Sequence, residues 1–545
     1  MKKHLFIYMC MMVMGTACFT SCNEAEFLNL DDPSHLTEKN FWKSKADAES
    51  ALAAAYSPIK GQMYGYYGAF DGWLNLNGRG DDIFTVPNEE INMYNIATFQ
   101  NTVTTGNTPF GDLYSGIQRA NVVIKYVDQM EDRIISKSDK MMIKGEAMFL
   151  RAYQYFLLVN NYKEVPLRLL PSNEEAADKE PASEAQLWKQ VEDDLLYILK
   201  ECNLPVNRPS AQKGRIEKGA VVFLLGKVYA TQHKYAEAKE QLGQLLKSPY
   251  TYDLVDDYAS NFVNTSEFNK ESIWELQYSS DGQESWWNEV GVSLGSSIPQ
   301  FIGPVASGGW AKLMPTAFIV DAFGKELRPN GSDTKFDKRI YASFFFNPQE
   351  FGDVVKNEKW YGNNFSLDEL WEKNSGKMTS DDTPKFTFQG KQNCKFILKK
   401  YTAYYVKDKA ADNMANKQGK ANNVRIMRFA EALLLYAEAC AKTDDVAGAN
   451  EALKRIRNRA GLAEKTFAAE ELMPQIERQC LLEFFGEGHR FDDLKRWYSA
   501  EEMKQIFINN GKIGGERFEE KFKYYPIPMG ELNNNRAMKQ IDLWK

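Results

Sequence analysis

The chain has 545 residues, of which 43% are hydrophobic and 26% are charged. This balance is typical of a folded globular protein and excludes a disordered chain. The formal net charge of −7 argues against nucleic-acid binding, which depends on clustered basic residues.

The first residues have the pattern of an export signal. Two lysines precede a short apolar run over residues 5–14, and small residues follow it. That run is well short of the roughly 20 residues that a membrane-spanning helix needs. The string FTSC, which ends at Cys22, is similar to a lipobox, in which the cysteine is acylated. We therefore expect a signal peptide over residues 1–21 and a stable lipid anchor at Cys22. Acylation at Cys18 and lipid-free cleavage near Ala17 are the alternatives.

Cysteine and histidine are scarce in the rest of the chain. Cys202, Cys394, Cys440 and Cys480 are far apart and form no CxxC pair, which is not the spacing of a metal site. We expect them to be small core residues without a disulfide framework. Three histidines after the signal are too few for a mechanism that depends on several of them.

Amphipathic helices are predicted along the N-terminal half, where apolar residues recur at three- and four-residue spacing. They cover residues 47–63, 112–130, 140–159, 186–199, 221–231 and 236–246. In the last pair, Gly226 and Ala238 lie near the small-residue offsets of a tetratricopeptide repeat. Ala437 and Ala449 repeat their separation. We predict a mainly α, tetratricopeptide-type scaffold of stacked helix pairs; coincidental helical hairpins are the alternative.

Residues 251–423 have a different character. Glycines, serines and asparagines interrupt every periodicity, and alternating runs such as SIWELQY and KFTFQ predict short strands. Six of the eleven tryptophans lie here. We predict a loop-rich, mixed α/β excursion from the helical scaffold. Loops on a rigid scaffold often form binding surfaces.

Two stretches combine flat apolar side chains with polar groups, as binding of sugar rings requires. The first runs from residue 61 to residue 82 and the second from residue 281 to residue 310. Adjacent tryptophans on an extended segment point in opposite directions, so one of Trp286 and Trp287 is expected to be exposed. The alternative for each aromatic is a place in the core. The candidate ligand-binding residues are Tyr67, Trp73, Arg79, Asp81, Asp82, Trp286, Trp287, Asn288 and Trp310.

The sequence motifs give little support for an enzyme. Gly291 to Gly295 matches the G-x-S-x-G nucleophile elbow and would make Ser293 a nucleophile. That motif needs a helix after it, and Pro299 is ill placed for one. We therefore predict that the chain has no catalytic residues.

The remaining acidic motifs do not predict a reaction either. Adjacent acids such as Asp81-Asp82 and Asp492-Asp493 do not supply the two opposed carboxylates of a glycoside hydrolase. The second pair is expected to cap a helix or to pair with Arg490 and Lys495. Residues 330–337 carry oxygen ligands without EF-hand spacing. No cofactor or metal is predicted, and a structural calcium ion is left open.

Several strings along the chain together resemble the SusD/RagB family of surface glycan-binding lipoproteins of Bacteroidetes. They are FLNLDDPSHLTEKNFWKSKADAESALAAAY, LYSGIQRANVVI, GEAMFLRAYQYFLLVNNYKEVPL, GRIEKGAVVFLLGKVY, RFAEALLLYAEA, RIRNRAGL, FFGEGHRFDDLKRW and YYPIPMGEL. The resemblance extends from Cys22 to the C-terminus. The acids Glu24 and Glu26 resemble the family's signal for export to the cell surface.

The resemblance implies a SusD-like fold and a binding protein, not an enzyme. Family members cover a SusC-like TonB-dependent transporter in the outer membrane and capture oligosaccharides for import. Some members of the RagB type serve peptide import, which is the alternative function. Capture above the transporter raises the local ligand concentration. We expect a lipid-anchored outer-membrane protein that is exposed on the cell surface and binds no nucleic acid.

The expected organisation is a signal peptide (1–21), an N-terminal helical region (22–250), the excursion (251–423) and C-terminal repeat helices (424–545). Residues 22–545 are expected to form one SusD-like unit. The sequence departs from the family at Gln479 and Cys480, where a Glu-Arg pair is usual, and at Lys163, where glycine is frequent. These departures are expected to affect local packing more than function.

Overall fold

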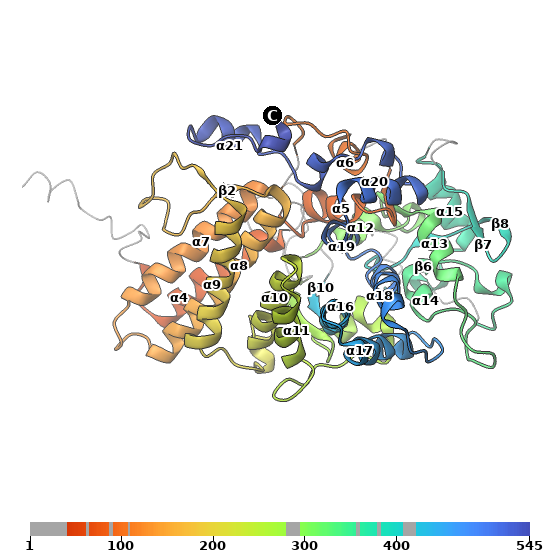
Figure 1. Cartoon of the computed structure of the whole chain (residues 1–545), viewed down its shortest axis with the longest axis horizontal. Coiled ribbons are helices and arrows are strands. Elements are labelled where there is room, and N and C mark those ends of the chain that lie inside the picture. The colour runs from red at the N-terminus through yellow and green to blue at the C-terminus, as the bar shows by residue number, and fades with distance from the viewer. Residues whose placement is uncertain are drawn as a thin grey trace, which may run out of the picture.

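The computed structural model describes residues 41–61, 65–86, 91–106, 109–279, 295–355, 360–378, 383–406 and 421–545. Helices dominate this part of the chain (Figure 1). The mainly α, tetratricopeptide-type fold class is therefore the one predicted. Among the described residues, no helix has the length and apolar character needed to cross a bilayer.

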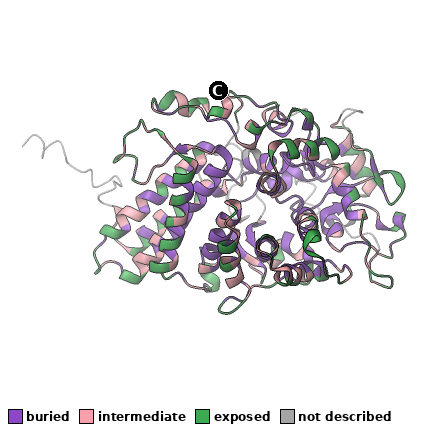
Figure 2. Ribbon diagram, viewed as in Figure 1, coloured by how far each residue is buried: buried purple, intermediate pink, exposed green. Residues whose placement is uncertain are grey.

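Four long helices form the N-terminal layer: α4 (Lys45–Lys60), α7 (Phe110–Gln129), α8 (Lys137–Tyr162) and α9 (Glu184–Glu201). Helix α8 packs against the other three, and nearly all of its residues after Ile143 are buried. Buried residues accordingly gather on the inward faces of this layer (Figure 2). Serine side chains cap three of these helices, which satisfies N–H groups that the first helical turn leaves unpaired.

The two predicted repeat pairs are α10 (Lys218–Thr231) with α11 (Tyr235–Gln244), and α16 (Phe429–Lys442) with α17 (Val446–Arg459). Helix α11 packs on α16, so the two pairs stack although about 200 residues separate them. A Cβ at Gly226 would lie 2.6 Å from Leu242 Cγ. The small residue therefore permits the close approach of α10 and α11. All six predicted N-terminal helices are present, with ends within three residues of the prediction.

The remaining elements are short except for α18. The other helices are α5 (Leu74–Gly78), α6 (Ile91–Ala97), α12 (Ile298–Ile302), α13 (Ala317–Gly324), α14 (Arg339–Ser343), α15 (Leu367–Ser375), α18 (Ala469–Glu483), α19 (Arg490–Trp497), α20 (Ala500–Asn509) and α21 (Met529–Asn534). A π-helical turn, η2 (Ala69–Trp73), precedes α5. The 3₁₀ turns are η3 (Ser210–Gln212), η4 (Tyr258–Phe262), η5 (Asn264–Ser266), η6 (Val305–Ser307), η7 (Pro348–Phe351), η8 (Tyr361–Asn363), η10 (Gly515–Arg517), η11 (Glu520–Lys523) and η12 (Asp542–Trp544).

The strands form two-stranded antiparallel ladders. The pairs are β1 (Ile83–Thr85) with β5 (Leu313–Pro315), β2 (Val165–Pro166) with β3 (Pro181–Ala182), β4 (Ser272–Leu276) with β10 (Val424–Arg428), β6 (Phe344–Phe345) with β9 (Ile397–Leu398), and β7 (Phe386–Phe388) with β8 (Lys391–Cys394). The strands β4 and β7 are the two that the alternating runs predicted. One hydrophobic core joins residues from Ala48 to Ile541. Among the described residues, Cys202, Cys394, Cys440 and Cys480 are buried and form no disulfide, as expected.

A buried ionic cluster lies between β10, α17 and α18. Arg428 contacts three carboxylates, those of Glu271 at 2.8 Å, Glu483 at 2.6 Å and Glu487 at 2.8 Å. The other members of the ionic cluster are Arg339, Arg459, Lys400 and Asp337, all paired within it. The surrounding arginines hold the pKa of Glu483 well below its usual range. Charges this deep are tolerated only when every one of them has partners.

The family departures lie in this scaffold. Gln479 is fully buried at the edge of the ionic cluster and accepts a hydrogen bond from Arg339 at 2.8 Å. Lys163 has a φ of +68° and is the central residue of a γ-turn in which Glu164 N–H bonds to the Tyr162 carbonyl at 2.8 Å. This turn is strained for any residue with a Cβ. The strain of this turn explains why glycine is frequent at this position in the family.

Candidate functional site

Trp73 is a core residue, which corrects its prediction as a ligand contact. Its side chain is 2% exposed and packs edge-on against Tyr401, with ring centroids 5.1 Å apart. The segment from Ala69 to Gly78 is helical. Helical periodicity turns the tryptophan inward, where an extended loop could have left it exposed.

Arg79 is also buried, and the prediction that it contacts ligand is wrong. Its guanidinium lies 3.7 Å from the centre of the Phe491 ring and donates to the Phe522 carbonyl at 2.9 Å. It also bonds to Asn161 at 3.3 Å. The side chain therefore joins the N-terminal stretch to the C-terminal region and is not available to a ligand.

Asp81 and Asp82 are buried as well, and their assignment to ligand binding is likewise corrected. Asp81 is fully buried and accepts hydrogen bonds from Arg490 at 2.7 and 3.0 Å and from Asn510 at 2.7 Å. Burial and the charge of Asp81 raise the pKa of Asp82 to about 7. Arg490 thus pairs with Asp81, while Asp493 in the first turn of α19 pairs with Arg496 at 2.8 Å. Both acids of the Asp492-Asp493 pair lie in the first turn of α19, whereas the ion pair of Asp493 is with Arg496 and not with Arg490 or Lys495.

Tyr67 lies half-buried beside η2. Its hydroxyl and that of Tyr153 share a hydrogen bond of 2.5 Å. Nearby, the hydroxyl of Tyr278 donates to the Lys60 carbonyl at 2.6 Å. The end of α4 is thereby tied to the residues that follow β4. The two predicted stretches meet where α12 packs against η2. Tyr67 stays a candidate contact.

Trp310 is the best-formed platform among the predicted residues. It ends a tight loop in which Trp310 N–H bonds to the Gln300 carbonyl at 2.7 Å. A Cβ at Gly309 would lie 2.2 Å from the Gly303 carbonyl oxygen, so only glycine fits there. The indole packs on Phe301, with ring centroids 4.6 Å apart, and remains half-buried. Close packing fixes the ring and leaves part of it accessible.

Further half-buried aromatics lie on neighbouring elements. Helix α15 packs against η6, where Val305 N–H donates to Asn374 at 2.8 Å. Phe365, Trp371 and Tyr404 line this part of the fold. We use the name aromatic face for these three rings together with Trp310, which follows η6; the name groups half-buried aromatics of neighbouring elements and does not describe a ring stack. Sequence reasoning missed Phe365, Trp371 and Tyr404 as site residues, because no pattern in the sequence separates them from the buried aromatics around them.

Some predicted positions cannot be placed. Cys22, Trp286, Trp287, Asn288 and Ser293 lie outside the described residues. Their roles stay predictions.

Two other sequence arguments can be compared with the structure. Helix α12 begins at Ile298 and holds Pro299 in its first turn, a position that tolerates proline. The expectation that Pro299 prevents a helix was therefore wrong. In the segment left open for calcium, Asp333 pairs with Arg328 and Asp337 with Arg339.

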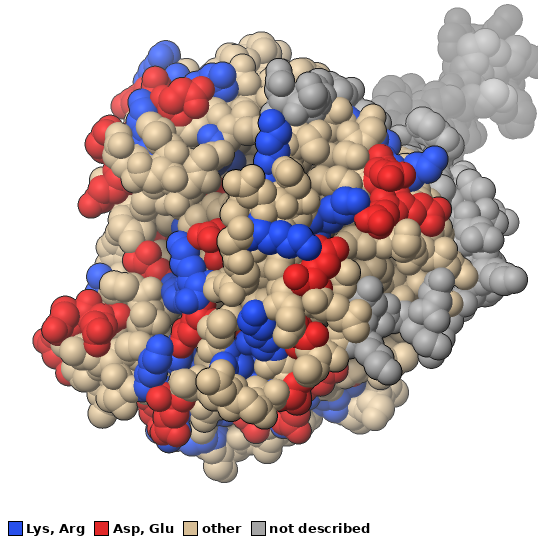
Figure 3. Space-filling view, turned by 90° about the vertical axis from the view of Figure 1, so that its right-hand side faces the viewer, with Lys and Arg blue, Asp and Glu red and all other residues tan. Residues whose placement is uncertain are grey.

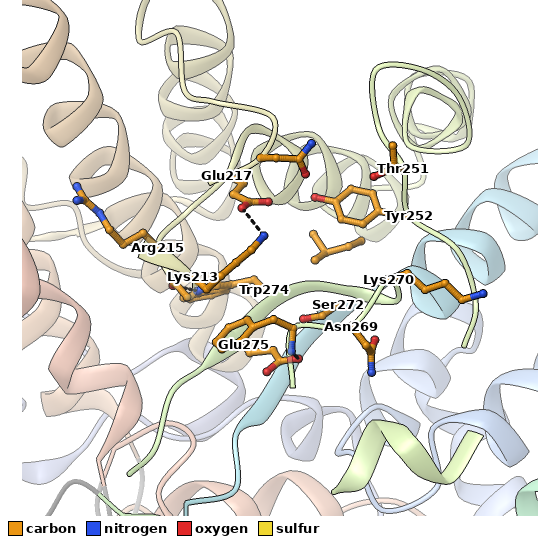
Figure 4. A pocket seen from close by; sticks show the side chains of 14 residues that line it. Lys213, Arg215, Glu217, Thr251, Tyr252, Asn269, Lys270, Ser272, Trp274 and Glu275 are labelled. Atoms are coloured by element: carbon orange, nitrogen blue, oxygen red, sulfur yellow. Dashed lines mark hydrogen bonds and ion pairs between the residues drawn. The ribbon is translucent and has the colours of Figure 1, made fainter. Parts of the chain in front are cut away.

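Charges of both signs are mixed on the face shown in Figure 3. Over the part of the chain that the structure describes, Lys and Arg side chains alternate there with Asp and Glu side chains. A polar pocket of about 180 Å³ lies between the segment 207–217 and β4 (Figure 4). Lys213 in this pocket pairs with Glu217 at 3.2 Å, and Arg215 points away from it to Glu146 at 2.7 Å. Its charges are therefore already compensated.

Comparison with known proteins gives the family. The model of the SusD family matches residues 270–544, and a model described as starch-binding associating with outer membrane matches residues 26–230. The SusD-like protein P25 of Formosa agariphila is 24% identical over 547 residues and covers 96% of both chains.

Solved structures agree with this match. A SusD superfamily protein from Bacteroides vulgatus is similar with a TM-score of 0.76 and 27% identity, over 92% of this chain and 100% of that one. Surface glycan-binding protein A from Bacteroides thetaiotaomicron, solved with laminarihexaose, has a TM-score of 0.70 and 21% identity, over 91% and 99%. The predicted resemblance is confirmed, and the chain belongs to the SusD family.

Proposed function

We propose that this protein captures oligosaccharides at the cell surface and passes them to a SusC-like TonB-dependent transporter without chemical conversion. The observation that carries the proposal is Trp310, an aromatic ring that its loop and Phe301 hold rigidly and leave half-exposed. A fixed platform avoids the entropy cost of ordering a mobile side chain when ligand binds.

The aromatic face suits the chemistry of sugars. Flat rings pack against the C–H faces of pyranoses, and Trp310 offers such a ring at the end of its loop. Two of the similar proteins also support glycan binding. One family model is described as starch-binding, and one structural neighbour was solved with laminarihexaose.

Anchoring and transfer complete the proposal. A lipid on Cys22 would hold the protein at the outer membrane, as the outer-membrane association in the description of the matching family model suggests. Tethering beside the transporter makes transfer an event at high effective concentration. The transporter partner and the surface location rest on the family resemblance.

The burial and pairing of Asp81 and Asp82 support the proposal that the protein is not a catalyst. Asp81 and Asp82 have pKa values shifted in opposite directions, a pattern found at acid–base sites. Both are buried and Asp81 is bound by Arg490, so a substrate does not reach them. A nucleophile elbow places its serine at the turn into a helix, whereas α12 starts five residues after Ser293.

Peptide capture is the second candidate function, and one observation favours it. A groove of about 600 Å³ runs between α8, α9, α19 and η11. Its walls carry side chains of both signs, including Glu184, Asp492, Lys495 and Lys523. Both charged termini of a short peptide would find partners in such a groove.

The test is native gel electrophoresis in a panel of plant, host and microbial polysaccharides. The protein is residues 23–545, which include every described residue. Trp310→Ala is compared with Trp42→Ala, a tryptophan stacked on Tyr126 in the N-terminal layer. We expect one polysaccharide to retard the parent and the Trp42 variant but not the Trp310 variant, without new reducing ends. Retardation by no polysaccharide, with binding of a peptide pool, would favour peptide import.

A further inference from the structure

A cavity separate from the aromatic face lies beside the β1–β5 ladder. Its volume is about 300 Å³, and its walls come from α5 and β1, α6, the residues after β5, and the segments 383–385 and 511–513. None of the four residues of the aromatic face lines it. This volume is at the lower end of small-molecule pockets. The cavity therefore has room for one small ring and not for a length of chain.

Thr85 and Gly78 line the cavity together. Thr85 is 3% exposed, and its hydroxyl oxygen has no hydrogen-bond partner among the described residues. A Cβ at Gly78 would lie 2.6 Å from that oxygen, so the hydroxyl occupies the place that a side chain at position 78 would take. A buried polar group without a partner costs free energy. A ligand hydroxyl in the cavity would recover it once the shielded Thr85 hydroxyl turns toward the ligand.

The other walls combine apolar surface with donors and acceptors. Phe84 and Ile513 contribute apolar surface. The hydroxyls of Thr98 and Thr316 donate to backbone carbonyls, and the Thr98 hydroxyl also accepts from Gln100 at 2.7 Å, so Thr316 is the better acceptor for a ligand. A ring with one apolar face and several hydroxyl groups matches this lining.

The charged side chains that line the cavity are two lysines. Lys512 is buried and uses two N–H donors on the carbonyls of Gly78 and Gly80, at 2.9 and 2.6 Å. Burial lowers its pKa to about 8, against the opposing effect of Asp81 and Asp82 behind it. Lys385 is exposed at the cavity, and no aspartate or glutamate is among the lining residues. The site thus favours a ligand that brings a negative charge.

We propose that this cavity is a second carbohydrate subsite that takes one terminal sugar ring, with preference for a ring that carries a carboxylate. The hydroxyl groups of such a uronic acid would pair with the threonines, and its carboxylate would face the lysines. This inference rests on glycan capture as the proposed function and adds a class of sugar to it. It is independent of the aromatic face.

The test is ligand-observed NMR titration of residues 23–545 with two monosaccharides, galacturonate and glucose. We expect saturable binding of both, with galacturonate the tighter ligand. Thr85→Val removes one hydroxyl hydrogen bond and should weaken both ligands about fivefold. Thr443→Val, a threonine at the end of α16, is the matched control.

Two further variants test the shape of the cavity and its charge separately. Gly78→Ala should abolish binding of both sugars, whereas Gly111→Ala, where nothing lies within 4 Å of the new Cβ, should leave it unchanged. Lys385→Gln should weaken galacturonate about threefold and leave glucose unaffected.

The outcomes separate this inference from the proposed function. Monosaccharide binding that is lost in Trp310→Ala but retained in Thr85→Val and Gly78→Ala would overturn the second subsite and support the aromatic face. Absence of binding by either sugar would also overturn it, whatever the polysaccharide gels show. Equal affinity for the two sugars would overturn the preference for a carboxylate. If uronate binds but no polysaccharide retards the protein, the second subsite stands, and only the proposed role of the aromatic face is contradicted.

Discussion

The ionic cluster around Arg428 and the aromatic face around Trp310 contrast in which side chains are buried. In the ionic cluster, eight charged side chains are buried with their charges compensated. On the aromatic face, rings that could have filled a core stay half-exposed. Charge density therefore marks the scaffold of this protein, and incompletely buried aromatic surface marks the candidate site. A search for function by charged motifs would have led to the wrong region.

The largest effect should follow from breaking the ionic cluster. Glu483→Gln keeps the shape of the side chain but leaves Arg428, Arg459 and Arg339 without their shared partner. We expect a loss of about 3–5 kcal/mol in the free energy of unfolding, measured by urea denaturation at pH 7.

The pH dependence provides the control for this variant. The pKa of Glu483 is lower in the folded protein than in the unfolded chain, so its contribution is present above the unfolded pKa and is lost as the pH falls through the folded value. The stability difference between parent and variant should therefore shrink in acid. A difference that stays constant down to low pH would contradict the assigned role.

A large effect of a different kind is expected at the aromatic face. Trp310→Ala should weaken glycan binding about thirtyfold, or about 2 kcal/mol, while Trp310→Phe should recover part of it. Isothermal titration with the polysaccharide selected by the gels measures both. Unchanged affinity in Trp310→Ala would remove the aromatic face from the site.

Asp82→Asn tests whether the charged residues of the first predicted stretch belong to the scaffold. The pKa of Asp82 is raised to about 7, so the folded protein loses stability as the pH rises from the unfolded value of about 4 towards 7. The variant should be more stable by about 1–2 kcal/mol at pH 8 and unchanged near pH 4. Thermal unfolding at both pH values measures this.

Binding separates the two regions in the same variant. Asp82→Asn should retain full glycan affinity, because Asp82 is buried beside Asp81 and not at the aromatic face. A variant that folds normally and has lost its ligand would restore Asp82 to the binding site.

The smallest effect is expected at Lys163. Glycine relieves the strained γ-turn at a φ of +68° but gains entropy in the unfolded chain. We expect Lys163→Gly to stabilise the protein by about 0.5–1 kcal/mol and to leave binding unchanged. Lys189→Gly, at an exposed position inside α9, should instead destabilise it by about 1 kcal/mol.

The fold was largely predictable because helical periodicity is a local signal. Helix α4 and the helices α7 to α11 follow from apolar spacing, whereas the short α5 and α6 were not predicted. The matched spacing of Gly226–Ala238 and Ala437–Ala449 predicted that the two repeat pairs stack. Sequence strings such as FFGEGHRFDDLKRW identified the family. Their glycines and charges serve the scaffold: Gly486 and Gly488 have positive φ values, and Glu487 binds Arg428.

The site was less predictable because exposure depends on contacts between distant segments. Trp73 and Trp310 both stand in glycine-rich, aromatic sequence, yet Tyr401 covers the first, and the second remains half-exposed. Likewise Asp81 looked available until Arg490, 409 residues away, was placed against it. No spacing rule reports such pairings.

The contact between Asp81 and Arg490 also bears on when the chain can fold. A nascent chain cannot close this pair, or the stacking of Arg79 on Phe491, until nearly the whole polypeptide has been synthesised. Such a high contact order slows folding. For a chain exported as its first residues predict, this delay would be useful. The precursor would stay open long enough to be threaded across the inner membrane, and it would acquire its binding surface only on the far side.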